Sequence, residues 1–501
     1  MSRRVYIETV GCQMNVLDSE LLAARLEEAG CRMVPSRSDA DTILFNTCSV
    51  RQHAEDKIYS ALGRLKHLKD QRPGTIIGVL GCMAQRASRD ILRRAPHVDL
   101  VVGPGRLGQL DELIARIEEG EGPLVEISGQ RRGNKQAEVA RSFAQFDGPR
   151  KTELRPGAHQ AHVRIMFGCD QFCTYCIVPS VRGPEQSRPV EAVVDEVRRL
   201  ADQGCQEVTL LGQAVNRYAD RSEGEARDLA DLLRRLDVID GLHRIRFVTN
   251  HPRYMTDRLI AAVAELPRVC PYFHVPAQHG AEAVLRRMNR GYTVEEYRRL
   301  VERIRAAVPQ GDGPLGAAIT SDFIVGFCGE TEEDFQRTVD LVRWARFKNS
   351  YIFKYSPRVG TKAAERFADD VPEAEKRRRN NELLDVQNQV SLEDNRRLVG
   401  CRLEVLVEGP SKAARKLDTR TQGGGEEGGA DSSGPPDARG QLVGRTAGDR
   451  IVVFPGPTSL TGRIIPVKIE KADACTLFGG VEEGGSSREG LQENPDDNSR
   501  I

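Results

Sequence analysis

Three closely spaced cysteines constrain this chain more than any other feature. Cys169, Cys173 and Cys176 follow an apolar stretch from His162 to Phe167 that is typical of a β-strand. Three thiolates on one short loop can each bind one iron of a 4Fe–4S cluster, whose fourth iron then has no nearby protein ligand. A zinc half-site or a redox pair is the alternative for Cys173 and Cys176. No second CxxC or HxxxH follows, so the spacing favours a cluster with one open iron.

The cysteine loop opens a series of strand-then-helix units. The series predicts a partial (β/α)6 barrel over residues 155–392, with its chemistry at the carboxyl ends of the strands. The six expected strands are His162 to Phe167, Glu207 to Leu211, Arg244 to Thr249, Tyr272 to Val275, Ala317 to Val325 and Ser350 to Tyr355. A charged helix around Pro372 to Leu398 closes this region.

Residues 1–120 contain three earlier strand-then-helix units, which predict an open parallel α/β sheet domain. The expected strands are Val5 to Val10, Thr42 to Asn46 and Thr75 to Leu80. Cys12, Cys48 and Cys82 each follow one of these strands. Because the carboxyl ends of parallel strands share one edge of a sheet, the three thiolates can converge there on a second 4Fe–4S cluster. The alternative is three unrelated, semi-buried cysteines.

The rest of the chain is expected to contain a linker, a small β domain and two disordered segments. The polar stretch 121–154 is interpreted as the linker. Residues 393–471 alternate like the strands of a small β domain, interrupted by a Gly-rich insertion, 411–440, that cannot build a core. The acidic tail 472–501 is also expected to be disordered. The fold class is therefore α/β multidomain with a small carboxyl-terminal β domain.

Composition limits the partners and the compartment. Lysine and arginine together number 73, as do aspartate and glutamate, so a nucleic acid would have to be held by local basic patches. No signal peptide or membrane-length apolar run is present, which favours a cytoplasmic protein with no membrane partner. The thiols are then reduced, and grouped cysteines indicate metal. The remaining cysteines are interpreted as small core residues: Cys31, Cys205, Cys270, Cys328, Cys401 and Cys475.

Several motifs together resemble the radical-AdoMet methylthiotransferases, and among them the MiaB-type tRNA enzymes. The resemblance covers nearly the whole chain except the insertion and the tail. Its motifs are Gly11 to Asn15, Asp18 to Glu20, Asn46 to Arg51, Gly168 to Cys176, Val178-Pro179, Arg182-Gly183, Ser187 to Pro189, Leu211 to Gln213 with Asn216, Arg246-Phe247, His251-Pro252, Ser321 to Phe327 and Gly329 to Thr331.

The resemblance implies two 4Fe–4S clusters, S-adenosyl-L-methionine (AdoMet) and a small carboxyl-terminal β-barrel domain of the TRAM type that binds RNA. It places AdoMet near Gln213, Asn216, His274, Gln278 and Ser321, and leaves the catalytic residues unknown. His279 and Cys328 depart from the residues usual in the family, serine and proline. Arg445, Arg450, Arg463, Lys468 and Lys471 are the expected phosphate contacts of the β domain.

The implied activity is methylthiolation of N6-isopentenyl(dimethylallyl)adenosine at tRNA position 37, next to the anticodon. Gln13, Met14 and Asn15 favour this substrate over threonylcarbamoyladenosine or a ribosomal-protein aspartate. A non-catalytic, metal-stabilised RNA-binding protein is the alternative of another class. The expected partners are the tRNA anticodon loop, a reducing electron donor and a sulfur source, with the protein acting as a monomer.

Overall fold

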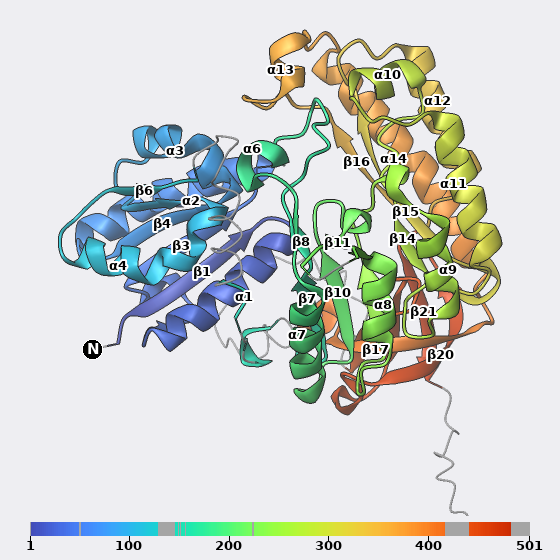
Figure 1. Ribbon diagram of the computed structural model, residues 1–501, viewed down its shortest axis with the longest axis horizontal. Helices are drawn as coiled ribbons and strands as arrows, with labels where there is room; N and C mark the ends of the chain where they lie inside the picture. Colours follow the sequence, from blue (N-terminus) through green and yellow to red (C-terminus); the bar gives the residue numbers. More distant parts are fainter. Residues whose placement is uncertain are drawn as a thin grey trace, which may run out of the picture.

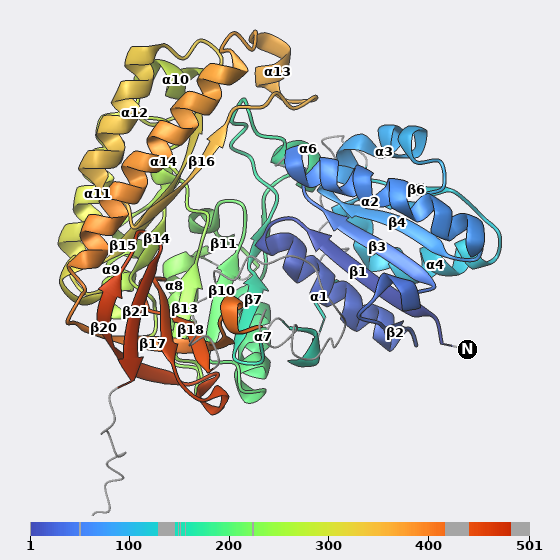
Figure 2. The same ribbon diagram turned by 180° about the vertical axis from the view of Figure 1, so that it is seen from behind.

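The computed structural model describes residues 2–49, 52–128, 146–148, 150, 152–155, 157–222, 225–415 and 440–481, with backbone alone for 52–54. Much of the predicted linker, insertion and tail therefore lies outside the described residues, as do Val50 and Arg51 of one motif. Figures 1 and 2 show an amino-terminal α/β domain beside a half-barrel, with a small β-barrel packed against the base of the half-barrel.

The amino-terminal domain is a six-stranded parallel sheet in the order β2-β1-β3-β4-β5-β6. Its strands are β1 (Arg4–Val10), β2 (Arg32–Met33), β3 (Thr42–Thr47), β4 (Ile76–Gly81), β5 (Leu100–Val102) and β6 (Leu124–Glu126). Its helices are α1 (Gln13–Glu28), α2 (Gln52–Gln71), α3 (Cys82–Arg94) and α4 (Leu110–Glu118). Two apolar clusters bury the two faces of the sheet.

The structure corrects the predicted extent of this domain. Three strands were missed, and β6 lies within the stretch predicted as linker 121–154. Phe146, also in that stretch, packs into the core beneath the sheet. A strand of three residues has no detectable periodicity, and its identity as a strand comes from pairing with its neighbour.

The half-barrel has the six predicted parallel strands in sequence order. They pair as two groups of three, β7-β10-β13 and β14-β15-β16, connected by a parallel bridge between Ile245 and Val269. The strands are β7 (Gln160–Arg164), β10 (Glu207–Leu211), β13 (Arg244–Phe247), β14 (Tyr272–His274), β15 (Ala318–Val325) and β16 (Asn349–Lys354). The covering helices are α7 (Val190–Asp202), α8 (Leu229–Asp237), α9 (Asp257–Glu265), α11 (Val294–Ala307), α12 (Glu332–Ala345) and α14 (Glu373–Arg396).

The half-barrel also contains shorter elements. They are β8 (Met166–Phe167) paired with β9 (Gln186–Ser187), the hairpin β11 (Ala219–Asp220) and β12 (Arg227–Asp228), and the helices α6 (Val178–Arg182), α10 (Glu282–Arg287) and α13 (Lys362–Arg366). Among the described residues, no helix is long and apolar enough to cross a membrane.

The carboxyl-terminal domain is a closed five-stranded barrel in the order β17-β18-β19-β21-β20. Its strands are β17 (Arg402–Pro410), β18 (Gln441–Arg445), β19 (Ile451–Pro455), β20 (Ile464–Ala472) and β21 (Thr476–Val481). The closing strand β21 falls in the stretch predicted as disordered tail, because its two glycines hide the alternation that marks a strand. The stretch predicted as insertion begins too early, since Ser411 is buried and bonds Gln441 at 2.8 Å.

Buried arginines dock this small barrel onto the half-barrel. Arg246 donates to the carbonyl oxygens of Thr446 and Ala447 at 2.6 and 2.8 Å. Arg450, also buried, pairs with Asp312 at 3.2 Å. Arg445 pairs with Glu408 and Asp449 of the small barrel itself at 2.9 and 2.8 Å, and its side chain is 34% exposed. The prediction that Arg450 contacts phosphate is therefore wrong, whereas that for Arg445 stays a prediction.

Candidate functional site

The Cys169, Cys173 and Cys176 thiols lie together on the loop that follows β8, and we call them the AdoMet trio. Gly168 starts the loop at a φ of +73°, and a Cβ there would lie 1.9 Å from the Pro184 carbonyl oxygen. The Cys169 amide donates to the Gly183 carbonyl oxygen, and the Cys176 amide to that of Cys173. Glycine is therefore required where the chain turns into the loop.

Distant segments clamp the AdoMet trio from the other side. The Thr174 amide and hydroxyl donate to the carbonyl oxygens of Met288 and Arg287 at 3.0 and 2.8 Å, at the end of α10. The Ala363 amide, in α13, donates to the Thr174 carbonyl oxygen at 2.7 Å. The loop is thus held by elements far along the chain.

Burial raises the pKa of Cys169 to about 11 and that of Cys176 to about 12, and the neighbouring thiols of the trio contribute to both increases. Three thiolates this close together on a buried loop need positive charge beside them, which a bound metal cluster would supply. No set of three His, Cys, Asp or Glu side chains in the described part of the chain could hold a single metal ion. A cluster differs from such a site, because each thiolate binds a separate iron.

Cys12, Cys48 and Cys82 also come together, and we call them the auxiliary trio. In the sheet Val10 pairs with Thr47, and Thr47 pairs with Gly81. Cys12 lies two residues after Val10, and Cys48 and Cys82 directly follow Thr47 and Gly81, so all three cysteines lie at one edge of the sheet. The Cys12 thiol interacts with that of Cys48, which lowers the pKa of Cys12 to about 6. The register of the three strands therefore brings the three cysteines to the carboxyl edge of the sheet, as predicted.

A buried polar network shapes the chain beneath the auxiliary trio. Asn15 Nδ2 donates to Asn46 Oδ1 at 3.0 Å, and Asn46 Nδ2 donates to the backbone carbonyl oxygen of Asn15 at 2.9 Å. A Cβ at Gly11 would lie 2.4 Å from Asn15 Oδ1, and one at Gly81 would lie 2.6 Å from Asn46 Oδ1. The two glycines are needed for the close approach of these asparagines, and this local reason is independent of any cluster.

Arg182, at the end of α6, connects the two trios. Its guanidinium is buried, donates from Nη2 to Asp18 Oδ2 at 2.8 Å, and lies beside the Cys82 and Cys12 thiols. Asp18 is fully buried in α1 and accepts a second hydrogen bond from Arg164 of β7 at 2.9 Å. The amino-terminal domain is therefore joined to the half-barrel by ion pairs next to the auxiliary trio.

Four of the predicted AdoMet residues lie at or after the ends of strands, and Ser321 lies in the middle of β15. They differ in what their polar atoms do. Asn216 Nδ2 donates to the His251 carbonyl oxygen and its Oδ1 accepts from the His251 amide, both at 2.9 Å. Ser321 Oγ accepts from the Ala277 amide at 2.9 Å. These two side chains hold loops in place. Gln213 Oε1, in contrast, is buried with no hydrogen-bond partner among the described residues, as expected of a group that contacts a bound molecule.

His274 is the last residue of β14, and Gln278 lies on the segment that follows the strand. His274 Nδ1 lies 2.9 Å from Thr320 Oγ1, and its Nε2 lies 3.4 Å from Asp322 Oδ2. Gln278 has a φ of +67°, and its amide donates to the Asp322 carbonyl oxygen at 2.8 Å. The Ile324 amide donates to the Gln278 carbonyl oxygen at 2.9 Å, so this left-handed residue is paired with β15 through both of its backbone groups.

Arg290 is the main site residue that sequence reasoning missed. Its buried Nη1 donates to Cys173 Sγ at 3.2 Å, and its Nη2 donates to the Pro276 carbonyl oxygen at 3.3 Å. It lies between α10 and α11, far along the chain from the cysteine loop, so no local spacing could have linked the two. It places a fixed positive charge next to the AdoMet trio.

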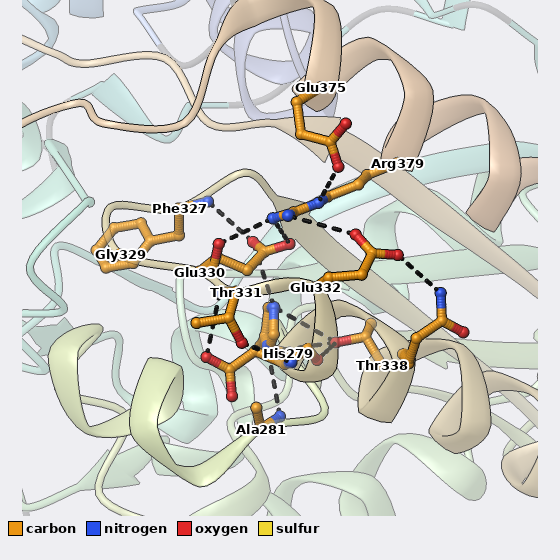
Figure 3. A network of polar contacts seen from close by, with 12 residues as sticks. His279, Ala281, Phe327, Gly329, Glu330, Thr331, Glu332, Thr338, Glu375 and Arg379 are labelled. Atoms are coloured by element: carbon orange, nitrogen blue, oxygen red, sulfur yellow. Dashed lines mark hydrogen bonds and ion pairs between the residues drawn. The ribbon is translucent and has the colours of Figure 1, made fainter.

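His279, one of the two departures from the family pattern, belongs to a network of polar contacts with Glu330, Thr338 and Arg379 (Figure 3). The Ala281 amide donates to His279 Nδ1 at 3.1 Å, so the proton of the neutral ring is on Nε2, which lies 3.4 Å from Glu330 Oε2. Glu330 also accepts from Arg379 of α14 at 3.0 Å. This histidine therefore connects loops and helices. Cys328 is buried beside Tyr355.

Burial of the six remaining cysteines is mixed. Cys205, Cys270 and Cys328 are buried as predicted, Cys31 and Cys401 are partly exposed, and Cys475 is exposed. The core interpretation is therefore wrong for Cys475, which lies in the turn between β20 and β21.

Comparison with known proteins matches the three structural parts. Residues 4–103 match Uncharacterized protein family UPF0004, residues 163–342 the Radical SAM superfamily, and residues 434–481 the TRAM domain. A solved radical S-adenosylmethionine methyltransferase, TsrM from Kitasatospora setae, superposes with a TM-score of 0.49 at 18% identity, covering 73% of this chain and 77% of its own.

Full-length relatives give the family. A tRNA-2-methylthio-N(6)-dimethylallyladenosine synthase from Rhodopirellula baltica is 50% identical, with 96% of each chain covered. Enzymes of the same name from Acidovorax sp. and Moorella thermoacetica are 44% and 42% identical, with 97% and 95% of this chain and 98% of each relative covered. The chain therefore belongs to the family of the tRNA-2-methylthio-N(6)-dimethylallyladenosine synthases.

Proposed function

We propose that this protein adds a methylthio group to N6-dimethylallyladenosine at position 37 of tRNA, next to the anticodon. The proposal rests on sequence identity of 50% and 42%, over nearly the whole chain, to two enzymes named for that product. The site supports it, because two cysteine trios lie at strand ends in two adjoining domains. We place the reaction in the cytoplasm, with the protein acting as a monomer beside a reducing electron donor and a sulfur source.

Each trio is assigned one 4Fe–4S cluster. Bound at the AdoMet trio, a cluster with an open iron supplies reductive cleavage of AdoMet and hence a radical able to abstract hydrogen from an unactivated carbon such as adenine C2. The auxiliary trio is assigned the sulfur chemistry. The unpartnered Gln213 Oε1 and Arg182 Nη1, both buried, fit groups that bind beside them.

The chain's own residues position and shield the reactants. Arg290 keeps a positive charge beside Cys173, and Thr174 fixes the loop against α10 and α13. Asn216 and Ser321 fix the loops that surround the AdoMet position. The substrate base has to leave its stack to reach this interior, and a single-stranded anticodon loop permits that at low cost.

The test offers reconstituted enzyme three substrates under anaerobic, reducing conditions. They are dimethylallylated tRNA, the same tRNA without modification, and threonylcarbamoylated tRNA. Methylthio nucleoside should form predominantly with the first, together with S-adenosylhomocysteine and 5′-deoxyadenosine. Preferential turnover of the third would reassign the substrate. Absence of AdoMet cleavage with both clusters loaded would instead favour a non-catalytic RNA-binding protein.

A further inference from the structure

Helix α6 is a short physical link between the two cysteine trios. It begins two residues after Cys176 and ends at Arg182. Val181 of α6 and Ile177, which caps its start, pack on Cys82 of the auxiliary trio. Figure 1 shows α6 between the amino-terminal domain and the half-barrel, next to α3, which begins at Cys82. One five-residue helix therefore follows the AdoMet trio in the chain and packs against the auxiliary trio.

Arg182 places a buried cation at this link. Its side chain is 3% exposed, and the Asp18 carboxylate that it contacts is fully buried and shared with Arg164. A buried guanidinium is costly unless its donors are used. Its Nη1 nevertheless has no hydrogen-bond partner among the described residues, while the thiols of Cys82 and Cys12 lie next to the same guanidinium.

We propose that Arg182 is a positioning residue of the auxiliary cluster, whose Nη1 donates a hydrogen bond to a sulfur at that site. The proposal rests on the cluster assignment made above. Hydrogen bonds and positive charge at the sulfur atoms favour the reduced, more negative state of an iron–sulfur cluster and so raise its midpoint potential. Through Asp18 and α6, the same residue ties the auxiliary site to the AdoMet loop.

The chain provides a matched control for this role. Arg150 is equally buried at the same domain interface, where it bonds Glu20 of α1 at 2.9 Å and Glu196 of α7 at 2.8 Å. Glu20 lies two residues after Asp18 on the same helix. Replacing Arg150 by glutamine thus disturbs the interface to a similar extent without removing the charge beside the thiols.

The experiment isolates the auxiliary cluster in a Cys169→Ala, Cys173→Ala, Cys176→Ala protein reconstituted with iron and sulfide. Iron content and the midpoint potential, from electron paramagnetic resonance during redox titration, are compared for this protein and for the same protein with Arg182→Gln, Arg182→Lys or Arg150→Gln. Arg182→Gln should lower the potential or lose iron. Arg182→Lys keeps the charge, so its midpoint potential and iron content should be closer to those of the triple-alanine protein. Arg150→Gln should have the same potential and iron content as the triple-alanine protein.

The outcomes separate the proposals. If Arg182→Gln and Arg150→Gln behave alike in both potential and iron content, the role of Arg182 is overturned. If the triple-alanine protein itself binds no cluster although its far-ultraviolet circular dichroism is that of the wild type, the assignment of the auxiliary trio fails first. A lowered potential restricted to Arg182→Gln supports both.

Discussion

At the residue scale, the motif Gln13-Met14-Asn15 combines three different roles. Met14 is buried in the core of the amino-terminal domain, and Asn15 is fully buried in the network with Asn46. Gln13 alone is exposed, beside Cys12. A motif that looks like one signature in the sequence therefore contains two residues that build the sheet edge and one that remains available to a substrate.

The six cluster cysteines should divide into two kinetic classes. Cys173→Ala removes a ligand of the cluster that reduces AdoMet, so formation of 5′-deoxyadenosine should fall below detection. Cys48→Ala should retain most of that cleavage but lose the methylthio product, because the auxiliary trio is assigned the sulfur chemistry. Both products are measured by chromatography of the same anaerobic reaction. Equal loss of cleavage in the two variants would contradict the division.

His251 should make the fold sensitive to acid. Burial, followed by the charge of Arg290, lowers its pKa from 6.5 to about 3. Between pH 6.5 and pH 3, His251 is protonated in the unfolded chain but stays neutral in the folded protein. The free energy of unfolding therefore has its full value above pH 6.5 and decreases as the pH falls towards 3, by up to about 1.4 kcal/mol per pH unit.

His251→Gln should therefore flatten the decline of the unfolding free energy between pH 6.5 and pH 4.5. Urea denaturation followed by circular dichroism at several pH values measures it. His243→Gln, at an exposed position, is the control and should leave the slope as in the wild type. Parallel slopes for His251→Gln and the wild type would show that this ring is protonated in the folded protein.

At the scale of elements, the closing strand β21 should decide whether the small barrel exists. It pairs with both β19 and β20 and contributes Leu477 to the core. A chain ending at Ala472 leaves those two strands with open edges, so the domain should become sensitive to trypsin and tRNA affinity should fall at least about tenfold, since several phosphate contacts are lost together.

A chain ending at Val481 is the matched control for this truncation. It keeps all five strands and should bind tRNA as the complete protein does. Filter binding at fixed salt compares the three chains. Wild-type affinity of the chain that ends at Ala472 would place the RNA contacts outside this barrel.

At the scale of the whole molecule, docking of the small barrel separates two kinds of arginine. Arg463 is exposed on the barrel surface, whereas Arg450 is buried against Asp312 at the contact with the half-barrel. Arg463→Gln should lower the slope of log affinity for tRNA against log salt by about 0.7 to 0.9, as expected for one lost phosphate contact.

Arg450→Gln should act on stability instead. It removes the charged partner of the buried Asp312, which keeps the hydrogen bonds from the Thr446 hydroxyl and the Gly448 amide. Breaking a buried ion pair costs about 3 to 5 kcal/mol. The salt dependence of tRNA binding should remain that of the wild type below the new unfolding temperature. Binding at several salt concentrations and thermal unfolding measure the two effects. A reduced salt slope for Arg450→Gln would mean that this side chain reaches the RNA.

The sequence by itself determined the features encoded by local spacing and period. Alternating strands and helices predicted the parallel sheet and the half-barrel, because each unit is long enough to show its own periodicity. The Cys169–Cys176 spacing predicted one cluster site, since all three ligands lie on one loop. Cys12, Cys48 and Cys82 could be joined because each follows a strand and parallel strands end at one edge.

Tertiary structure decided what depends on partners distant in the chain. The three-residue strands β5 and β6 and the glycine-containing strand β21 form through pairing with their neighbours, which has no local signature. Arg182 and Arg290 reach the two trios because packing brings α6 to Cys82 and the end of α10 to Cys173. A charge in a sequence does not indicate whether it will meet solvent, phosphate or a buried carboxylate, since only the fold sets its neighbours and its exposure.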